Sequence, residues 1–182
     1  MNKYFLSILI VVSIAASVLV AASNFEKKEP VYIGPWADEF TIAPGQIAVA
    51  RSGWANCSMG LQEDWLKHTI MTLELYKDGQ LIQTVSASNA GKWVQETPNP
   101  DMSGHCIHIN EISSVRWYFE DLALKKPGIY ILHFHIETTA VMTDGFDWND
   151  EAGNPNPDGR MDVYPAQVWQ DKDITINVLP KD

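Results

Sequence analysis

Apolar and polar residues alternate with a period of two through the middle and the end of the chain, and this pattern constrains the fold more than any other feature. A period of two places alternate side chains on opposite faces of a β-strand, so each segment has one face for the core and one for water. The inward positions of the three clearest segments are Val115, Trp117, Phe119, Tyr130, Leu132, Phe134, Ile136, Ile174, Ile176 and Val178. The alternation therefore predicts strands that pack on a core through one face.

Turn signals separate these strands. The stretch "MTLELYKDGQLIQTV" has Asp78-Gly79 between two alternating runs, which is the signal for a two-residue hairpin. Pro44-Gly45 separates two expected strands in "FTIAPGQIAVARSGW", and "GLQEDWLKH" is the segment with room for one or two helical turns. Short strands separated by turns over about 150 residues predict an all-β, antiparallel sandwich.

The first 23 residues, "MNKYFLSILIVVSIAASVLVAAS", have the composition of a secretory signal peptide. One early lysine precedes an apolar run over residues 5–22, and Ala21 and Ser23 fit the small-residue rule for a cleavage site. An uncleaved, single-pass anchor helix with the domain outside the cell membrane is the alternative, because about 17 apolar residues lie at the lower limit for a bilayer span. Both interpretations predict a secreted, periplasmic or surface domain. Residues 24–30 would form a charged linker and residues 31–182 the sandwich domain.

The acidic charge of the chain argues against a nucleic-acid partner. The formal net charge is −10, and the 13 Lys and Arg residues are spread along the sequence. Phosphate binding requires such residues in a cluster. Apolar residues make up 46% of the chain, which is enough for one core, and we interpret the seven Trp residues as core packing.

Cys57 and Cys106 are the two cysteines of the chain. In an oxidising compartment a pair of cysteines is expected to form a disulfide, provided that the Cα atoms lie within about 7 Å. The alternative uses the segments "CSMG" and "GHCIH" as soft ligands for copper, through Cys57, Met59, His105, Cys106 and His108. The spacing of these residues matches no strong metal-site template, so the disulfide is the favoured prediction.

His133 and His135 are two residues apart on an expected strand, so their rings share one face. With Glu137 they have the ligand types for zinc or copper. No third ligand follows at an informative spacing, and we therefore interpret the two histidines as polar residues on the outer face of a half-buried strand. His68, His105 and His108 are too scattered to be assigned to a site from sequence.

Residues 144–162, "DGFDWNDEAGNPNPDGRMD", gather oxygen-bearing side chains in one loop. In calcium loops of the D-x-[DN]-x-[DN]-G kind, ligands at alternate positions converge where the glycine turns the chain. The matching set here is Asn154, Asn156, Asp158, the Arg160 carbonyl and Asp162, with Asp147, Asp150 or Glu151 folding back to complete the shell. The alternative is a surface turn without an ion, because Asn, Asp, Gly and Pro favour turns by themselves.

Several segments resemble known families. "KPGIYILHFHIE" followed by "DITINVL" resembles the last two strands of immunoglobulin-like and fibronectin-type extracytoplasmic modules. "SGWANCSMGL", "SSVRWYFEDLALKKPGIY", "MTDGFD" and "DGRMDVY", taken in order, resemble uncharacterised bacterial secreted domains of that sandwich type, over roughly residues 31–179. The acidic loop is similar to the calcium loops of dockerin and thrombospondin-type repeats. The resemblance implies an antiparallel, immunoglobulin-like sandwich that serves in binding, adhesion or scaffolding.

The sequence contains no nucleophile elbow, zinc-protease helix, phosphate loop or dinucleotide loop. We therefore predict a non-catalytic extracytoplasmic binding or structural module, stabilised by calcium, whose partner is an envelope or extracellular protein or a glycan. A periplasmic or surface copper-binding protein is one alternative. A secreted hydrolase on a β scaffold is another, since carboxylates for a catalytic pair are plentiful.

Overall fold

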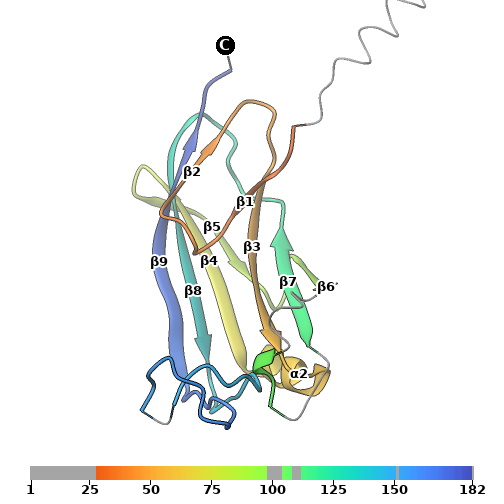
Figure 1. The fold of residues 1–182 in the computed structure, drawn as a ribbon. Coiled ribbons are helices and arrows are strands. Elements are labelled where there is room, and N and C mark those ends of the chain that lie inside the picture. Colours follow the sequence, from red (N-terminus) through yellow and green to blue (C-terminus); the bar gives the residue numbers. More distant parts are fainter. Residues whose placement is uncertain (1–27, 98–103, 108–111, 151, 182) are drawn as a thin grey trace, which may run out of the picture.

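Two sheets face each other in the computed structural model, which describes residues 28–97, 104–107, 112–150 and 152–181 (Figure 1). The four-stranded sheet has the order β1(Val31–Ile33), β3(Ala48–Asn56), β7(Ser113–Phe119), β6(Lys92–Glu96). The five-stranded sheet has the order β2(Glu39–Ile42), β9(Gln167–Val178), β8(Gly128–Thr138), β4(Thr69–Lys77), β5(Gln80–Ser86). One helix, α2(Met59–His68), is present in the described part of the chain, and the architecture is a mostly β sandwich.

The predicted inward positions form the core between the sheets. Leu73 lies opposite Phe134, and Leu75 opposite Leu132, in the register of β4 and β8. Leu132 in turn lies opposite Ile174 on β9. All five side chains are at most 1% exposed, and Trp117 packs against them from the other sheet. The prediction that the period of two identifies the core positions of these strands is therefore confirmed.

The expectation of purely antiparallel sheets is wrong at two edges, because β1 pairs with β3, and β2 with β9, in parallel. The chain places β1, β2 and β3 alternately in the two sheets and reverses direction between successive strands. Two reversals bring β3 back to the direction of β1, so the two strands pair in parallel. Pro44-Gly45 does separate two strands, as predicted, but the strands belong to different sheets.

The hairpin at Asp78-Gly79 is confirmed between β4 and β5. Both turn residues have a positive φ, 52° for Asp78 and 75° for Gly79. Positive φ at both positions is the requirement of the type I′ turn, whose twist matches that of the flanking strands. The sequence pair Asp-Gly meets this requirement because glycine has no Cβ and aspartate tolerates the left-handed region.

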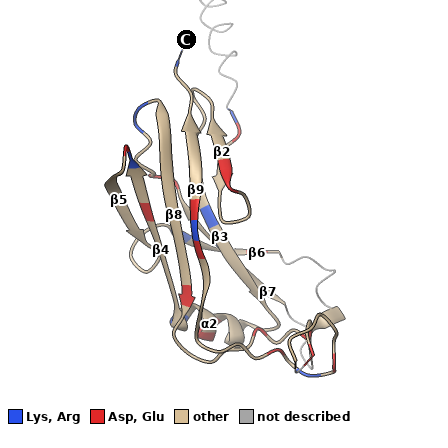
Figure 2. Ribbon diagram, turned by 90° about the vertical axis from the view of Figure 1, so that its left-hand side faces the viewer, with Lys and Arg blue, Asp and Glu red and all other residues tan. Residues whose placement is uncertain are grey.

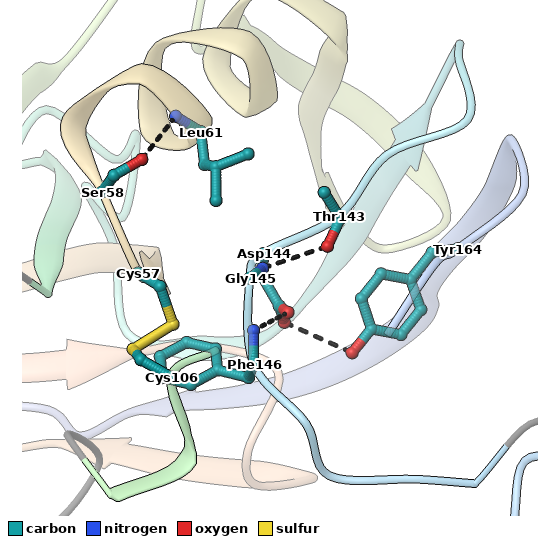
Figure 3. The surroundings of a disulfide bond; sticks show 9 residues. All are labelled: Cys57, Ser58, Leu61, Cys106, Thr143, Asp144, Gly145, Phe146 and Tyr164. Atoms are coloured by element: carbon teal, nitrogen blue, oxygen red, sulfur yellow. Dashed lines mark hydrogen bonds between the residues drawn. A yellow bond between two sulfur atoms is a disulfide. The ribbon is translucent and has the colours of Figure 1, made fainter. Parts of the chain in front are cut away.

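The helix α2 closes one end of the sandwich, and it begins at a Ser58 cap whose hydroxyl accepts a hydrogen bond from the Leu61 amide at 3.2 Å. Just before it, Cys57 is bonded to Cys106, with the Cα atoms 5.6 Å apart (Figure 3). The predicted disulfide is thus confirmed. It ties the end of β3 to the segment that carries Cys106, which itself bridges to Phe146 of the acidic loop.

No helix among the described residues is long and apolar enough to cross a membrane. The predicted signal or anchor, residues 1–23, lies outside the described residues, as do the first residues of the predicted linker. The first strand of the sandwich, β1, begins at Val31.

Candidate metal centre

The outer face of β4, β8 and β9 carries two rows of polar side chains. In the register of these strands Glu74, His133 and Asp173 form one row, and Thr72, His135 and Asp171 form the next. The side chains share this face because residues at every second position of a strand point the same way. Figure 2 shows acidic positions on β4 and β9, the two strands that pair with β8.

Asp171 brings the two histidines together through one carboxylate oxygen. Its Oδ1 lies 3.1 Å from Nε2 of His133 and 3.3 Å from Nδ1 of His135. The remaining nitrogen of each ring faces a different acid. His133 Nδ1 is 2.9 Å from Asp173 Oδ1, and His135 Nε2 is 3.6 Å from Glu137 Oε2.

His133, His135 and Asp171 are the described group of side chains that could hold a metal ion, with one ligand atom from each within 4.8 Å of the others. The two histidines are 32% and 26% exposed, so an ion can reach them from solvent. Imidazole nitrogen and carboxylate oxygen are ligands of zinc and of copper(II). Rigid β-strands hold all three residues, which limits how far the ligand atoms can move.

From the sequence we considered His133, His135 and Glu137 as ligands but favoured polar residues of an outer face, and we did not consider Asp171. The third ligand comes from β9, which pairs with β8 only in the folded chain. A signal for it was present, because Asp171 and Asp173 repeat on β9 the spacing of two that the histidines have on β8. Two such pairs on neighbouring strands of one sheet would predict the cluster, once the pairing of the strands is known.

The residues considered as soft ligands for copper do not form a metal site in the described part of the structure. Its two sulfur atoms from Cys57 and Cys106 are bonded to each other, so no thiolate is left to bind a metal. Met59 accepts a hydrogen bond from the Ser113 hydroxyl at 3.1 Å, and His105 stacks on Trp148 with ring centroids 4.0 Å apart. The remaining member, His108, lies outside the described residues.

Two acids of the calcium prediction point into the loop and bind its backbone. Asp147 accepts hydrogen bonds from the amides of Asp158 and Gly159 at 2.9 and 2.8 Å. Asp162 accepts from the Trp148 and Asn149 amides at 3.1 and 3.2 Å. Both side chains are at least nine-tenths buried. These carboxylates hold the two limbs of the loop together.

The other predicted calcium ligands are partly gathered. Asp150, Asp158, Arg160 and Asp162 line a hollow of about 460 Å³, while Asn154 and Asn156 are exposed and lie outside its described lining. Asn154 instead donates to Asp150 from its side chain, at 3.1 and 3.2 Å. Glu151 lies outside the described residues. Calcium binding by the loop stays a prediction.

Asp144 is a third buried carboxylate of this loop, 6% exposed. It accepts a hydrogen bond from the Phe146 amide at 3.0 Å and lies next to the Tyr164 hydroxyl (Figure 3). Burial raises the pKa of Asp144 to about 6, because the charged form loses its hydration. Burial and the nearby carboxylates also raise the pKa of Tyr164.

Comparisons of the chain with family models, with curated proteins and with solved structures give no significant match. An all-β sandwich serves many functions, so the fold by itself does not define the function of this protein. The Cys57–Cys106 disulfide fits an oxidising environment outside the cytoplasm.

Proposed function

We propose that this protein is an extracytoplasmic β-sandwich module that binds a divalent transition-metal ion through His133, His135 and Asp171. The observation that carries the proposal is the position of Asp171 Oδ1, within 3.3 Å of a nitrogen of each imidazole. The ion would replace the hydrogen-bonded protons at the centre of these three atoms, with small adjustments of the side chains.

The orientation of both rings supports this assignment. His133 turns Nε2, and His135 turns Nδ1, toward Asp171, while the opposite nitrogens face Asp173 and Glu137. Metal-binding histidines commonly donate their second N–H to a carboxylate, which fixes the tautomer and increases the basicity of the ligating nitrogen. Asp173 and Glu137 thus lie where they can orient the two histidine ligands.

The donor set selects the metal. Two nitrogens and one carboxylate suit zinc or copper(II), whereas magnesium and calcium prefer shells made of oxygen alone. Three protein ligands also leave at least one coordination position open to solvent or to a further ligand. The proposed role is that of a binding module whose ion is open to a further ligand from an envelope or extracellular partner.

Calorimetric titration of the disulfide-bonded protein with zinc and with copper(II) tests the proposal. We expect one ion per chain with a dissociation constant on the order of micromolar, which corresponds to about −8 kcal/mol. His135→Gln should weaken binding at least tenfold, because it removes one of three ligands. His68→Gln is the matched control, since His68 lies on α2, where its Nε2 is 3.6 Å from Oδ1 of Asp64. Equal binding by wild type and His135→Gln would refute the site.

A further inference from the structure

A groove lies on the outer face of the five-stranded sheet, directly beside the metal centre. Its volume is about 560 Å³, and His133 forms part of its wall. The other walls come from β4 and its hairpin turn, from the start of β8 and from Asp173 on β9. An ion bound at His133, His135 and Asp171 would therefore lie at one end of the groove.

The groove has a strongly acidic lining. Glu74, Asp78 and Asp173 contribute three carboxylates, and none of its described lining residues is Lys or Arg. Glu74 is held in place by a hydrogen bond from the Tyr76 hydroxyl. The neighbouring cation on β9, Lys172, is bound to Asp38 with an N–O distance of 2.6 Å. The charge of the groove therefore favours a cationic group.

Apolar side chains form the rest of the groove. Tyr76 and Ile131 lie opposite each other in the register of β4 and β8, and Ile129 is the next residue on the same face. Ile129 is 63% exposed, and Leu81, which lies outside the described lining but opposite Tyr76 on β5, is 51% exposed. Covering such surface stabilises a complex by roughly 25 cal/mol per Å² of apolar area. The groove thus offers an apolar surface next to its carboxylates.

We propose that the groove binds the N-terminal residue of a peptide. Its ammonium group lies near Glu74 and Asp173, its apolar side chain lies on Ile129 and Ile131, and its carbonyl oxygen binds the metal ion at His133. The contact with the metal rests on the proposed function, whereas the contacts with the carboxylates and the isoleucines do not.

An N-terminal residue carries these three groups within two bonds of one carbon atom. Glu74 and Asp173 flank His133 in one row across β4, β8 and β9, so an ammonium near both carboxylates is next to the metal position. The open coordination position of the ion accepts a neutral carbonyl oxygen. A ligand with a free carboxylate is disfavoured, because three acids line the groove.

Calorimetric titration with L-leucinamide tests the proposal, with N-acetyl-L-leucinamide as the probe that lacks the ammonium group. The disulfide-bonded protein is first loaded with zinc, and this step tests the metal site by itself. We expect L-leucinamide to bind the zinc-loaded protein at least tenfold more tightly than the acetylated probe and at least tenfold more tightly than it binds the zinc-free protein.

Variants locate the binding to the groove. Glu74→Gln and Ile129→Ser should each weaken L-leucinamide binding severalfold while leaving the zinc affinity unchanged. Ile70→Ser is the control, since Ile70 is exposed on the same face of β4 but lies outside the groove.

Zinc binding without L-leucinamide binding would overturn this inference and leave the proposed function standing. Equal binding of both probes, or equal binding with and without zinc, would also overturn it. Failure of both zinc and copper(II) to bind would refute both proposals.

Discussion

Asp144 and Asp162 are linked through the hydroxyl group of Tyr164, which lies 3.3 Å from a carboxylate oxygen of each. A single hydroxyl has one proton and can donate fully to one of the two acids at a time. Asp162 has further donors in the Trp148 and Asn149 amides. Asp144 is 6% exposed, and this burial raises its pKa.

This arrangement makes the stability of the fold depend on pH. The pKa of Asp144 is about 6 in the folded protein, whereas the ordinary pKa of a free aspartate side chain is 3.8. Between these values the folded state holds a proton that the unfolded state has lost. The contribution of Asp144 to the free energy of unfolding is therefore fully present below pH 4 and is lost as the pH rises through 6.

Asp144→Asn should remove this dependence. The stability of the variant relative to wild type should rise by about 2 kcal/mol from pH 4.5 to pH 7.5, because most of the free energy of a shift of about two pKa units is expressed in this window. Urea denaturation of both proteins at pH 4.5, 6.0 and 7.5, with the disulfide intact, measures the difference. A stability difference that does not change with pH would contradict the prediction.

Calcium should raise the melting temperature if the hollow beside Asp150, Asp158 and Asp162 holds the ion. Binding to the folded state alone stabilises it by about 2.7 kcal/mol at a hundredfold excess over the dissociation constant. Asp158→Asn should weaken this response, because Asp158 is exposed and lines the hollow. Asp121→Asn, away from the loop, is the control. A wild-type melting curve that millimolar calcium and a chelator leave unchanged would show that the loop is a turn without an ion.

The structure shows that Asp158→Asn is a more direct test of calcium binding than Asp162→Asn. Asp162 accepts hydrogen bonds from the Trp148 and Asn149 amides and is buried, so Asp162→Asn should itself destabilise the loop. The cost should be about 1–3 kcal/mol in chelator, since an unsatisfied buried donor costs that much. Thermal unfolding in chelator compares the two variants, and Asp158→Asn should show little loss. Equal stability of both variants would contradict this role of Asp162.

The core strands could be predicted because alternation is a local signal. Phe134 and Trp117 are each part of a run whose period alone places them inside. The parallel edges could not be predicted, since β1 and β2 are three and four residues long and their partners are chosen by packing of the whole chain. Their short length leaves no period from which a partner could be inferred.

The candidate site shows the same limit. His133 and His135 could be assigned to one face from their spacing, whereas the contact with Asp171 depends on the register of β8 against β9. In the acidic loop the sequence suggests ligands, and the structure shows that Asp147 binds backbone amides. A carboxylate that accepts from amides and one that binds an ion have the same local sequence, because turns and ion loops use the same residues.

Gly91 should be intolerant of alanine because of packing as well as backbone strain. Its φ is 77°, and an added Cβ would lie 2.4 Å from Nε1 of Trp117, which donates to the Ala90 carbonyl at 2.9 Å. Gly153 has a similar φ of 79° with no atom within 4 Å of an added Cβ. Gly153→Ala should cost about 1 kcal/mol through strain alone, and Gly91→Ala about 1–3 kcal/mol more through overpacking. Urea denaturation of both variants measures the difference, and equal losses would contradict the packing argument.

The disulfide should contribute a large part of the stability of the sandwich. Cys57 and Cys106 are separated by 49 residues, and closing a loop of that length in the unfolded chain is worth about 4 kcal/mol in the chain-entropy model. The Cys57→Ser/Cys106→Ser double variant should therefore melt at a much lower temperature, while a reducing agent should bring the melting temperature of the wild type close to that of the variant.

Gly145 packs near this bond, with an added Cβ 2.8 Å from the Cβ of Cys57, so the acidic loop should loosen together with α2. Hydrogen exchange of the double variant should show the loss of protection first at the backbone amides of residue 57 and of Asp162, which in the wild type donate to the Asp144 and Phe146 carbonyls. Unchanged exchange at both amides in the double variant would show that the loop is held without the disulfide.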